Sequence, residues 1–352
     1  MDYRYRVSCR WRISALNMNS VLKNVSIKAI SVSVPKKKFT LKQIVKKGAK
    51  NNKIINSSKM LGVKQNYTSS PNITTLDLCY DAAKDVIKNL KWKSSDVDIV
   101  VFVTQTPDYL MPSCSNIMHE KLGLKNECIC YDINLGCSGY VYGLWNISSI
   151  MQDKKFKRGL LLVGDTISKT VNNKDKINKL LFGDSGSATA LTNAKCGKMH
   201  FILGSQGKGY KNLILKKSGF RDQKNNPEFF MNGKEVFYFA IKNVPKLIKS
   251  LLKFSKAKID KMNYFIFHQA NKFMLEKIAD NIGIKSDKML FSIENYGNTS
   301  SSSIPTTICH ERDKILNSNN QDIIIAGFGA GFSFGAAKIS LLKTKILKIK
   351  KI

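Results

Sequence analysis

The sequence lacks the paired spacings by which cysteine and histidine usually bind metal ions. It contains eight cysteines and four histidines among 352 residues, yet neither a C-x-x-C nor an H-x-x-x-H pattern occurs. Such spacings are typical of zinc sites, and a disulfide framework is typical of short, cysteine-dense secreted chains. We therefore expect no metal site and no disulfide framework, and a reducing, cytoplasmic location.

The sequence also lacks a long uncharged apolar run. A membrane span needs roughly 18 to 20 such residues, and no stretch approaches that length. The first segment has basic residues but no sustained apolar region and no small-residue cleavage site, which makes it a poor signal peptide. We expect residues 1–21 to form a disordered extension, with Met18 as an alternative start, and residues 343–352 to form a frayed basic tail.

Acidic residues are scarce. The chain has 25 Asp and Glu against 58 Lys and Arg, a formal net charge of +33. A basic surface can neutralise nucleic-acid phosphates, which would give binding with a steep salt dependence. No recognition motif accompanies the charge, and lysine is spread along the whole chain. We therefore expect an acidic protein partner and no nucleic-acid partner.

Short β-branched segments alternate with helical segments along the chain. Examples are DIVVFVTQ at 98–105, ECICYDIN at 127–134 and RGLLLVGD at 158–165. Such alternation is typical of a layered α/β fold, and continuous apolar strands such as LLLVG are typical of central strands covered on both faces. With 43% hydrophobic residues, the chain can bury one large core or two domains of ordinary size.

The second half of the sequence repeats the pattern of the first. In the first half, YDIN leads through LGCSG into a helix, and LLLVGDT and FGDSGSATALT follow. In the second half, NYGNTSSSS leads into a helix, and DIIIAGF and GAGFSFGAAKIS follow. The segment FIFHQA of the second half corresponds to VFVTQT of the first. This recurrence suggests an internal duplication, with halves at 22–200 and 201–342. We expect the active site where the halves meet.

Cys137 is the strongest candidate nucleophile. It lies in NLGCSGYVYGL, where an apolar strand ends and a helix is predicted to begin near Ser138. The positive end of a helix dipole lowers the pKa of a thiol and stabilises the thiolate. Taken alone, this tetrapeptide is more typical of a buried, inert cysteine. None of the other seven cysteines has the same strand-to-helix setting with flanking glycines.

Two further polar residues could project into the same cleft. His268 ends the apolar strand FIFH, and Gln269, Ala270 and Asn271 open an amphipathic helix after it. Asn298 lies in ENYGNTSSSS, where a glycine and a polar run mark a turn before a helix. Each is singly more typical of a structural residue, a satisfied histidine or a turn asparagine.

The glycine-rich segment GFGAGFSFG at 327–335 does not fit a dinucleotide-binding loop. It lacks the G-x-G-x-x-G arrangement between a strand and a helix, and a strand pattern follows it. A more sensible role for this segment is to supply backbone N–H groups that stabilise an oxyanion. We expect no cofactor.

Taken together, LGCSGYVYGL, FGDSGSATAL, FHQAN, YGNTSSSSIP and GFGAGFSFGAA resemble the motifs of the 3-oxoacyl-(acyl carrier protein) synthase III family of the thiolase superfamily, in the same order. The separations between Cys137, His268 and Asn298, 131 and 30 residues, are also similar. The resemblance runs from about residue 22 to 342. It implies duplicated α/β halves in a five-layer αβαβα arrangement, with these three residues as the catalytic set.

The resemblance also implies a chemistry. Cys137 would take an acyl group from an acyl thioester, from CoA or a carrier protein, and malonyl-acyl carrier protein would then lose CO2. His268 and Asn298 would stabilise the enolate, and the N–H groups of Cys137 and, by motif position, Gly331 would hold the thioester oxyanion. The product would be a 3-oxoacyl thioester that is two carbons longer.

Family membership further implies a homodimer and substrate-binding residues. Met111 stands where the family commonly has phenylalanine lining the partner's acyl pocket, and a flexible methionine could change chain-length preference. Lys64 is the cation that remains in GVKQNY, where the family has a more basic segment for CoA. Lysine lacks arginine's bidentate geometry, so the donor could be carried by a protein instead. Asn271 would also contact substrate.

Several other enzyme classes share parts of this pattern. A thiolase uses a second cysteine in a C-x-G motif, which GFGAGFSFG lacks, and hydroxymethylglutaryl-CoA synthase uses a glutamate where this chain has Gln105. A chalcone-synthase-like enzyme, or one that makes a specialised polyketide or glycan acyl group, stays open. A non-catalytic carrier-protein-binding paralogue is a further alternative, and it requires that Cys137 be unreactive.

Overall fold

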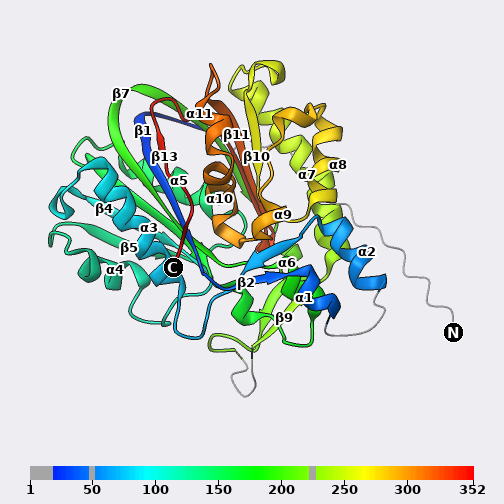
Figure 1. The fold of residues 1–352 in the computed structure, drawn as a ribbon. Helices are drawn as coiled ribbons and strands as arrows, with labels where there is room; N and C mark the ends of the chain where they lie inside the picture. The colour runs from blue at the N-terminus through cyan, green and yellow to red at the C-terminus, as the bar shows by residue number, and fades with distance from the viewer. Residues whose placement is uncertain (1–18, 47–51, 222–226) are drawn as a thin grey trace.

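The computed structural model describes residues 19–46, 52–221 and 227–352, and it has a mixed α/β fold (Figure 1). Within these residues the main sheet has ten strands, of which seven follow the order β10-β11-β12-β7-β6-β4-β5, while β1 pairs with β7, β13 and β14. The strands are β1 Asn19–Val34, β2 Lys38–Thr40, β3 Gln65–Tyr67, β4 Ile99–Val103, β5 Ile129–Ile133, β6 Arg158–Asp165, β7 Ser185–Ser205, β8 Leu213–Lys216, β9 Glu228–Met231, β10 Tyr264–Phe267, β11 Asp322–Gly329, β12 Ser333–Ser340, β13 Lys345–Ile346 and β14 Lys350–Lys351.

Helices cover the sheet on both sides and also lie between its two arms (Figure 1). The α-helices of the described residues are α1 Leu41–Lys46, α2 Asn52–Leu61, α3 Thr75–Leu90, α4 Cys114–Leu122, α5 Gly139–Ile150, α6 Lys176–Leu181, α7 Gly233–Phe254, α8 Lys272–Ile282, α9 Ile293–Tyr296, α10 Ser303–His310 and α11 Arg312–Leu316. None of them is both long and apolar enough to cross a membrane.

The strand pairing confirms the duplication predicted from the sequence. In the first half β4 runs parallel to β6, and β6 runs antiparallel to β7. In the second half β10 runs parallel to β11, and β11 runs antiparallel to β12. The strand of VFV, β4, is therefore equivalent to the strand of FIFH, β10. In the same way β6 is equivalent to β11, and β7 is equivalent to β12.

Alternating side chains along the strands build five layers. In β4, Val100 and Phe102 pack into an outer cluster with α3 and α4, whereas Val101 and Val103 pack into a central cluster with α5 and α10. In β11, Ile324 faces α7 and α8 on the other outer side. Because side chains alternate across a strand, β4 and β11 are apolar on both faces. The order is helix, sheet, helix, sheet, helix.

The two helices of the middle layer carry no charged residue apart from a histidine. α5 reads GYVYGLWNISSI, and seven of its twelve residues are buried. α10 reads SIPTTICH, and all of its residues except His310 are buried. A helix without a charged face can only be accommodated between other layers. Each of these helices begins beside a predicted catalytic residue, so the site lies near the centre of the molecule.

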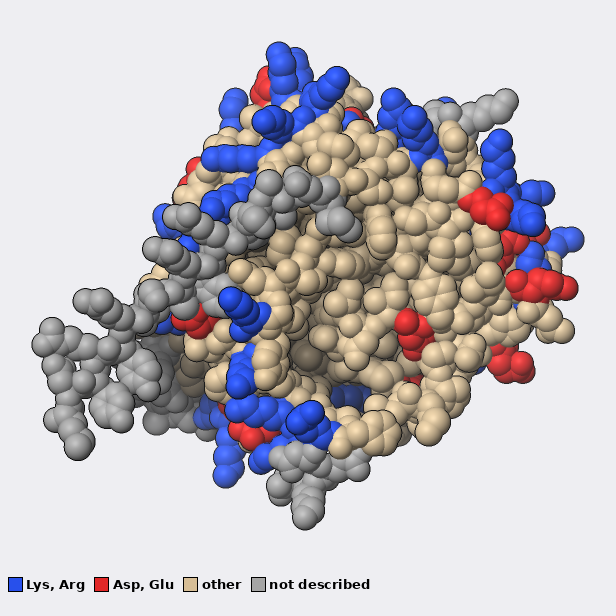
Figure 2. All heavy atoms as spheres, turned by 180° about the vertical axis from the view of Figure 1, so that it is seen from behind, with Lys and Arg blue, Asp and Glu red and all other residues tan. Residues whose placement is uncertain are grey.

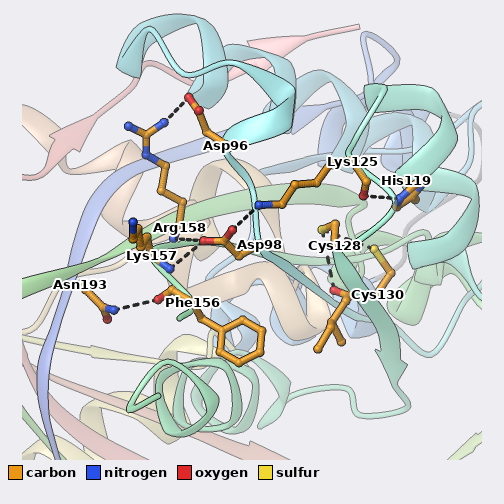
Figure 3. Close-up of polar contacts among 11 residues, drawn as sticks. Asp96, Asp98, His119, Lys125, Cys128, Cys130, Phe156, Lys157, Arg158 and Asn193 are labelled. Atoms are coloured by element: carbon orange, nitrogen blue, oxygen red, sulfur yellow. Dashed lines mark hydrogen bonds and ion pairs between the residues drawn. The ribbon is translucent and has the colours of Figure 1, made fainter. Parts of the chain in front are cut away.

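Asp98 fixes the relative position of three neighbouring strands in the first half (Figure 3). Its Oδ2 accepts the backbone N–H groups of Lys157 and Arg158, at 2.7 and 3.0 Å, at the start of β6. Its Oδ1 accepts Lys125 Nζ at 2.5 Å, ahead of β5. These bonds align the amino ends of β4, β5 and β6, and thereby align their carboxyl ends, after which Cys137 follows.

Both expected end segments differ from the sequence prediction. β1 begins at Asn19, which pairs with Ile202, so residues 19–21 belong to the sheet. Residues 1–18, including the alternative start Met18, lie outside the described residues. At the other end, β13 and β14 run parallel to β1. The tail at 343–352 is not frayed, because Ile346 is 2% exposed and packs into the central cluster.

No linker separates the halves at residue 200. β7 runs without interruption from Ser185 to Ser205. Its first part, from Ser185 to Thr192, pairs with β6, and its last part, from His200 to Ser205, pairs with β12. The predicted boundary therefore falls inside a strand that both halves share.

Candidate active site

Cys137 lies in the short loop between β5 and α5, where the sequence places it. The first residue of α5 is Gly139, with Ser138 as its N-cap. Ser138 Oγ lies 2.6 Å from Ser333 Oγ of β12, and both hydroxyls are buried. This contact joins the nucleophile loop of the first half to the glycine-rich strand of the second half.

Gly329 allows that strand to approach the thiol. A Cβ at this position would lie 2.6 Å from both Cβ and Sγ of Cys137, which is closer than real Cβ contacts. The glycine therefore gives β11 room to pass directly beside the nucleophile. The same approach brings the next residue, Ala330, into contact with the sulfur.

The resting pKa of Cys137 differs from the sequence expectation. Burial raises the pKa of the thiol to about 11, and the nearby carboxylate Asp165 adds to the rise. A hydrogen bond from the backbone of Ala330 lowers the pKa, but by less. Loss of hydration is therefore the largest influence on the pKa of Cys137, and the thiol is protonated at neutral pH.

His268 follows β10 and is 1% exposed. Its backbone N–H donates to Ala326 O at 2.7 Å, which continues the pairing of β10 with β11 and holds the residue at the end of the strand. Its Nδ1 lies 2.8 Å from Ser303 Oγ. Burial lowers the pKa of the imidazole to about 4, against a smaller rise from the Ser300 backbone. The ring is therefore neutral at pH 7.

Asn298 is held by the first half of the chain although it belongs to the second. Its N–H donates to Leu181 O at 2.7 Å, and its carbonyl accepts the N–H of Gly183 at 3.1 Å. Gly297 makes this approach feasible, because it has φ +67° and a Cβ there would lie 2.4 Å from Leu181 O. Asn298 is 6% exposed.

Cys137, His268 and Asn298 line one cavity of about 190 Å³. The other walls are mainly apolar side chains from α6, α7, the β8–β9 hairpin and neighbouring loops: Ile167, Leu181, Phe182, Leu213, Phe229 and Val236. A small polar set within an apolar pocket is typical of a site that binds a chain-like ligand and fixes its reactive end. The structure brings the predicted catalytic set together.

The backbone donor nearest the thiol is that of Ala330, not that of Gly331. Ala330 lines the cavity and hydrogen-bonds Cys137, whereas Gly331 is not among the lining residues. A Cβ at Gly331 would contact only Ser333. The structure therefore places the backbone of Ala330, and not that of the predicted Gly331, nearest the sulfur, because the close packing of Gly329 directs the following peptide at Cys137.

The predicted substrate-binding residues separate into two groups. Asn271 lines the cavity and is the N-cap of α8, since its Oδ1 accepts the N–H of Met274 at 2.8 Å. Lys64 does not line the cavity; it is 76% exposed and lies 2.5 Å from Glu294. Met111 is 80% exposed and also does not line the cavity of this single chain.

Sequence reasoning did not find Asp165 as part of the site. It is the last residue of β6, is fully buried, and accepts hydrogen bonds from Gln105 N and Ser301 Oγ. Burial raises the pKa of this carboxyl. The signal was present in RGLLLVGD, since a carboxylate that closes an otherwise apolar central strand is unusual.

Comparison with known proteins agrees with this geometry. The sequence matches the family described as 3-Oxoacyl-[acyl-carrier-protein (ACP)] synthase III over residues 131–207, and the C-terminal part of that family over residues 252–341. A beta-ketoacyl-[acyl-carrier-protein] synthase III of Clostridium perfringens is 33% identical over 288 residues, covering 80% of this chain and 88% of the relative. One of Streptococcus sanguinis is 31% identical and covers 81% and 90%.

Among solved structures, a 3-oxoacyl-(acyl-carrier protein) synthase of Burkholderia xenovorans superposes with a TM-score of 0.90 at 33% identity, covering 95% of this chain and 99% of that one. The synthase III of Pseudomonas aeruginosa has a TM-score of 0.81 at 23% identity, which shows the shared fold. By sequence and by its thiolase-like fold, the chain belongs to the beta-ketoacyl-[acyl-carrier-protein] synthase III family.

Proposed function

We propose that this protein catalyses the decarboxylative condensation of an acyl thioester with malonyl-acyl carrier protein through an acyl-Cys137 intermediate. The observation that carries the proposal is the convergence of Cys137, His268 and Asn298, from three separate loops, on one mainly apolar cavity. Family membership supports the same acyltransferase activity.

In the first stage Cys137 attacks the carbonyl carbon of the acyl thioester, and the donor thiol leaves. Burial keeps the pKa of the resting thiol at about 11, so the thiol loses its proton during the attack, and that proton leaves with the donor sulfur as the free donor thiol. The helix N-terminus and the Ala330 backbone stabilise negative charge that forms at this point. The N–H groups of Cys137 and Ala330 are the donors assigned to the carbonyl oxygen of the acyl enzyme.

In the second stage the malonyl group loses CO2. The carbon–carbon bond to the carboxylate breaks, its electron pair forms an enolate, and the enolate oxygen develops negative charge. His268 and Asn298 are assigned to that oxygen as neutral donors, which suits a histidine whose pKa is lowered to about 4. Such preorganised donors contribute about 3 to 4 kcal/mol each in comparable sites.

The nucleophilic carbon then attacks the acyl-Cys137 carbonyl carbon. A new carbon–carbon bond forms, the bond to the sulfur breaks, and the Cys137 thiolate is released, which takes up a proton from solvent and restores the resting thiol. The product is a 3-oxoacyl group on the carrier protein, two carbons longer than the donor acyl group. No step requires a metal ion or a redox cofactor.

The surface fits an acidic carrier protein. Figure 2 shows Lys and Arg around much of the rim of one face, with fewer Asp and Glu and an uncharged centre. The net charge of +33 accelerates association with an acidic partner at low salt. A cytoplasmic location belongs to the same proposal, and it is supported by the six free cysteines among the described residues.

A homodimer is also part of the proposal. Tyr109, Leu110 and Met111 are consecutive large apolar residues that are 62, 69 and 80% exposed, and Ile129 on β5 is 45% exposed. β5 ends the seven-strand order and pairs only with β4 among the described strands. An apolar surface beside an unpaired strand edge favours association with a second copy.

Intact-mass spectrometry after incubation with a panel of acyl-CoAs and acyl-carrier-protein thioesters tests the chemistry. We expect a mass gain of one acyl group in the wild type and in Cys114→Ala, and none in Cys137→Ala. Cys114 is a suitable control because it is fully buried in the outer cluster with α3. If Cys137→Ala retains the adduct, or if no donor in the panel acylates the wild type, the proposal is wrong.

A further inference from the structure

A buried carboxylate lies behind the nucleophile loop, and its two oxygens bind different halves of the chain. Asp165 Oδ1 accepts Gln105 N at 2.7 Å and Thr104 Oγ1 at 3.1 Å, both from the end of β4 in the first half. Asp165 Oδ2 accepts Ser301 Oγ at 2.6 Å and Ser301 N at 3.2 Å, from the segment after Asn298 in the second half. One side chain therefore bridges the two halves.

Both bridged segments lie close to the nucleophile loop. A Cβ on Gly136 would lie 2.3 Å from Gln105 Oε1 and 3.5 Å from Ser300 Oγ. A Cβ on Gly139 would lie 3.5 Å from Ser301 Cβ. Since Gly136 and Gly139 bracket Cys137, any shift of Gln105 or Ser301 alters the space around the sulfur.

The same bridge reaches the other two members of the catalytic set. Asn298 Oδ1 accepts the N–H of Ser300, the residue next to Ser301, at 2.9 Å. The Ser300 backbone is also a polar neighbour of the His268 ring. Anchoring Ser301 therefore fixes the segment that orients both enolate-binding side chains.

We propose that Asp165 is a positioning residue, which holds the Asn298–Ser301 segment and the Gln105 segment at fixed distances from Cys137. The inference rests on the proposed condensation. Asp165 reaches none of the reacting atoms, since it does not line the cavity. It acts through Ser301, Ser300 and Asn298 in the second half and through Gln105 in the first.

The charge of this carboxylate has a separate and opposite effect. Asp165 contributes to the raised pKa of Cys137, because a buried negative charge disfavours a thiolate nearby. Among the described residues no Lys or Arg forms an ion pair with Asp165; its partners are hydroxyl and backbone N–H groups. A neutral replacement should therefore make the sulfur easier to ionise while it loosens the enolate site.

These opposite effects give a test in Asp165→Asn. The amide keeps one acceptor oxygen but offers an NH2 group to one of the two bridged segments, so part of the bridge is lost. We expect the kcat of condensation to fall by about 10- to 100-fold, as a misplacement of about 1 Å produces. We expect alkylation of Cys137 by iodoacetamide at pH 8 to become about threefold faster, because more thiolate is present.

Asp184→Asn is the matched control. Asp184 is also a buried carboxylate at a segment junction, and it accepts Ser69 N at 2.7 Å and Ser168 Oγ at 2.6 Å, but it does not contribute to the pKa of Cys137. This variant should leave the alkylation rate unchanged. Ser301→Ala removes one hydroxyl of the bridge and keeps the charge, so it should slow condensation without accelerating alkylation.

The outcomes separate positioning from a merely structural role. If Asp165→Asn slows alkylation and condensation together, or leaves condensation within about twofold of wild type, Asp165 does not position the site. If Asp165→Asn fails to fold, Ser301→Ala decides, and wild-type condensation in that variant overturns the proposal. Alkylation is measured without substrate, so it still reports on Asp165 if the wild type proves inactive in condensation.

Discussion

Oδ1 of Asn298 accepts the backbone N–H of Ser300 at 2.9 Å. A side-chain amide has one acceptor oxygen and one NH2 group, so this bond leaves the NH2 group as the donor for the cavity. Asn298→Asp replaces that donor with an oxygen that carries negative charge. We expect condensation to fall by about 100- to 1000-fold, while acylation of Cys137 stays within about threefold of wild type.

Measuring acyl-enzyme formation and CO2 release separately checks this prediction. Asn295→Asp is a suitable control, because Asn295 lies on α9 near His310 and does not line the cavity. Equal losses in both half-reactions would show that Asn298 is not specific to the enolate stage.

The pKa of Cys137 predicts an unusual pH dependence of its alkylation. An ordinary thiol, with a pKa of about 8.5, is half ionised at that pH and approaches its full reactivity about one pH unit higher. With a pKa of about 11, Cys137 should react about tenfold faster for each pH unit between 7 and 9. Peptide mass spectrometry after brief treatment with iodoacetamide would measure the rate; a plateau below pH 9 would contradict the prediction.

The measurement has to resolve individual cysteines. Sγ of Cys130 on β5 lies 3.9 Å from Sγ of Cys128, which precedes that strand (Figure 3), and this thiol contact lowers the pKa of Cys130. Cys130 should therefore be alkylated at lower pH than Cys137. A Cys130→Ala background removes this competing reaction.

Gly329→Ala should abolish the close approach of β11 to the nucleophile. The new methyl group would lie 2.6 Å from Cys137 Sγ, so the strand or the nucleophile loop has to move. We expect acylation to fall by at least about 100-fold, with a loss of stability of about 1 to 3 kcal/mol. Gly207→Ala is the control, since a Cβ there meets nothing within 4 Å. Wild-type acylation in Gly329→Ala would show that the packing at Cys137 is looser than described.

His268 makes the stability of the fold depend on pH. Its pKa is about 4 when folded, against about 6.5 when unfolded, so between these values the unfolded chain binds more protons. Stability is therefore lost as pH falls from about 6.5 to 4. Wild type should lose about 3 kcal/mol more over this interval than His268→Asn, measured by urea unfolding. Parallel stability curves would contradict the assignment.

The exposed apolar residues beside β5 predict an oligomer that one charge can disrupt. Met111→Asp should shift the sedimentation behaviour from dimer toward monomer at micromolar concentration, because a charge at an apolar interface is left without a partner. Leu342→Asp is the control, since Leu342 is similarly exposed at 63% but follows β12. A monomeric wild type would remove the basis of the dimer proposal.

The sequence predicted those features of the fold and of the site that depend on a local pattern of residues. The strand RGLLLVGD was predicted at 158–165 and runs over those residues, because its apolar run ends at a charged residue and begins after a basic one. The positions of Cys137, His268 and Asn298 followed from motifs at strand and turn ends. These are local properties, and the structure retained them.

Other features depend on contacts between distant segments. The C-terminal tail looked solvated because it is rich in lysine, but Ile346 and Ile349 find apolar partners that only the folded β1 supplies. Ala330 replaces Gly331 as the nearest backbone donor because of packing between Gly329 and Cys137, 192 positions apart. The raised pKa of Cys137 likewise arises from burial by both halves, which no local motif encodes.

The continuity of β7 limits how the enzyme can move. Two domains that close on a substrate rotate about a few loop residues, whereas here 21 residues of one hydrogen-bonded strand cross from one half to the other. β1 is paired with β7 along nearly the same length. A rotation of one half against the other would therefore have to distort this pairing, and we expect substrate to enter and leave through rearrangement of side chains and surface loops around the cavity.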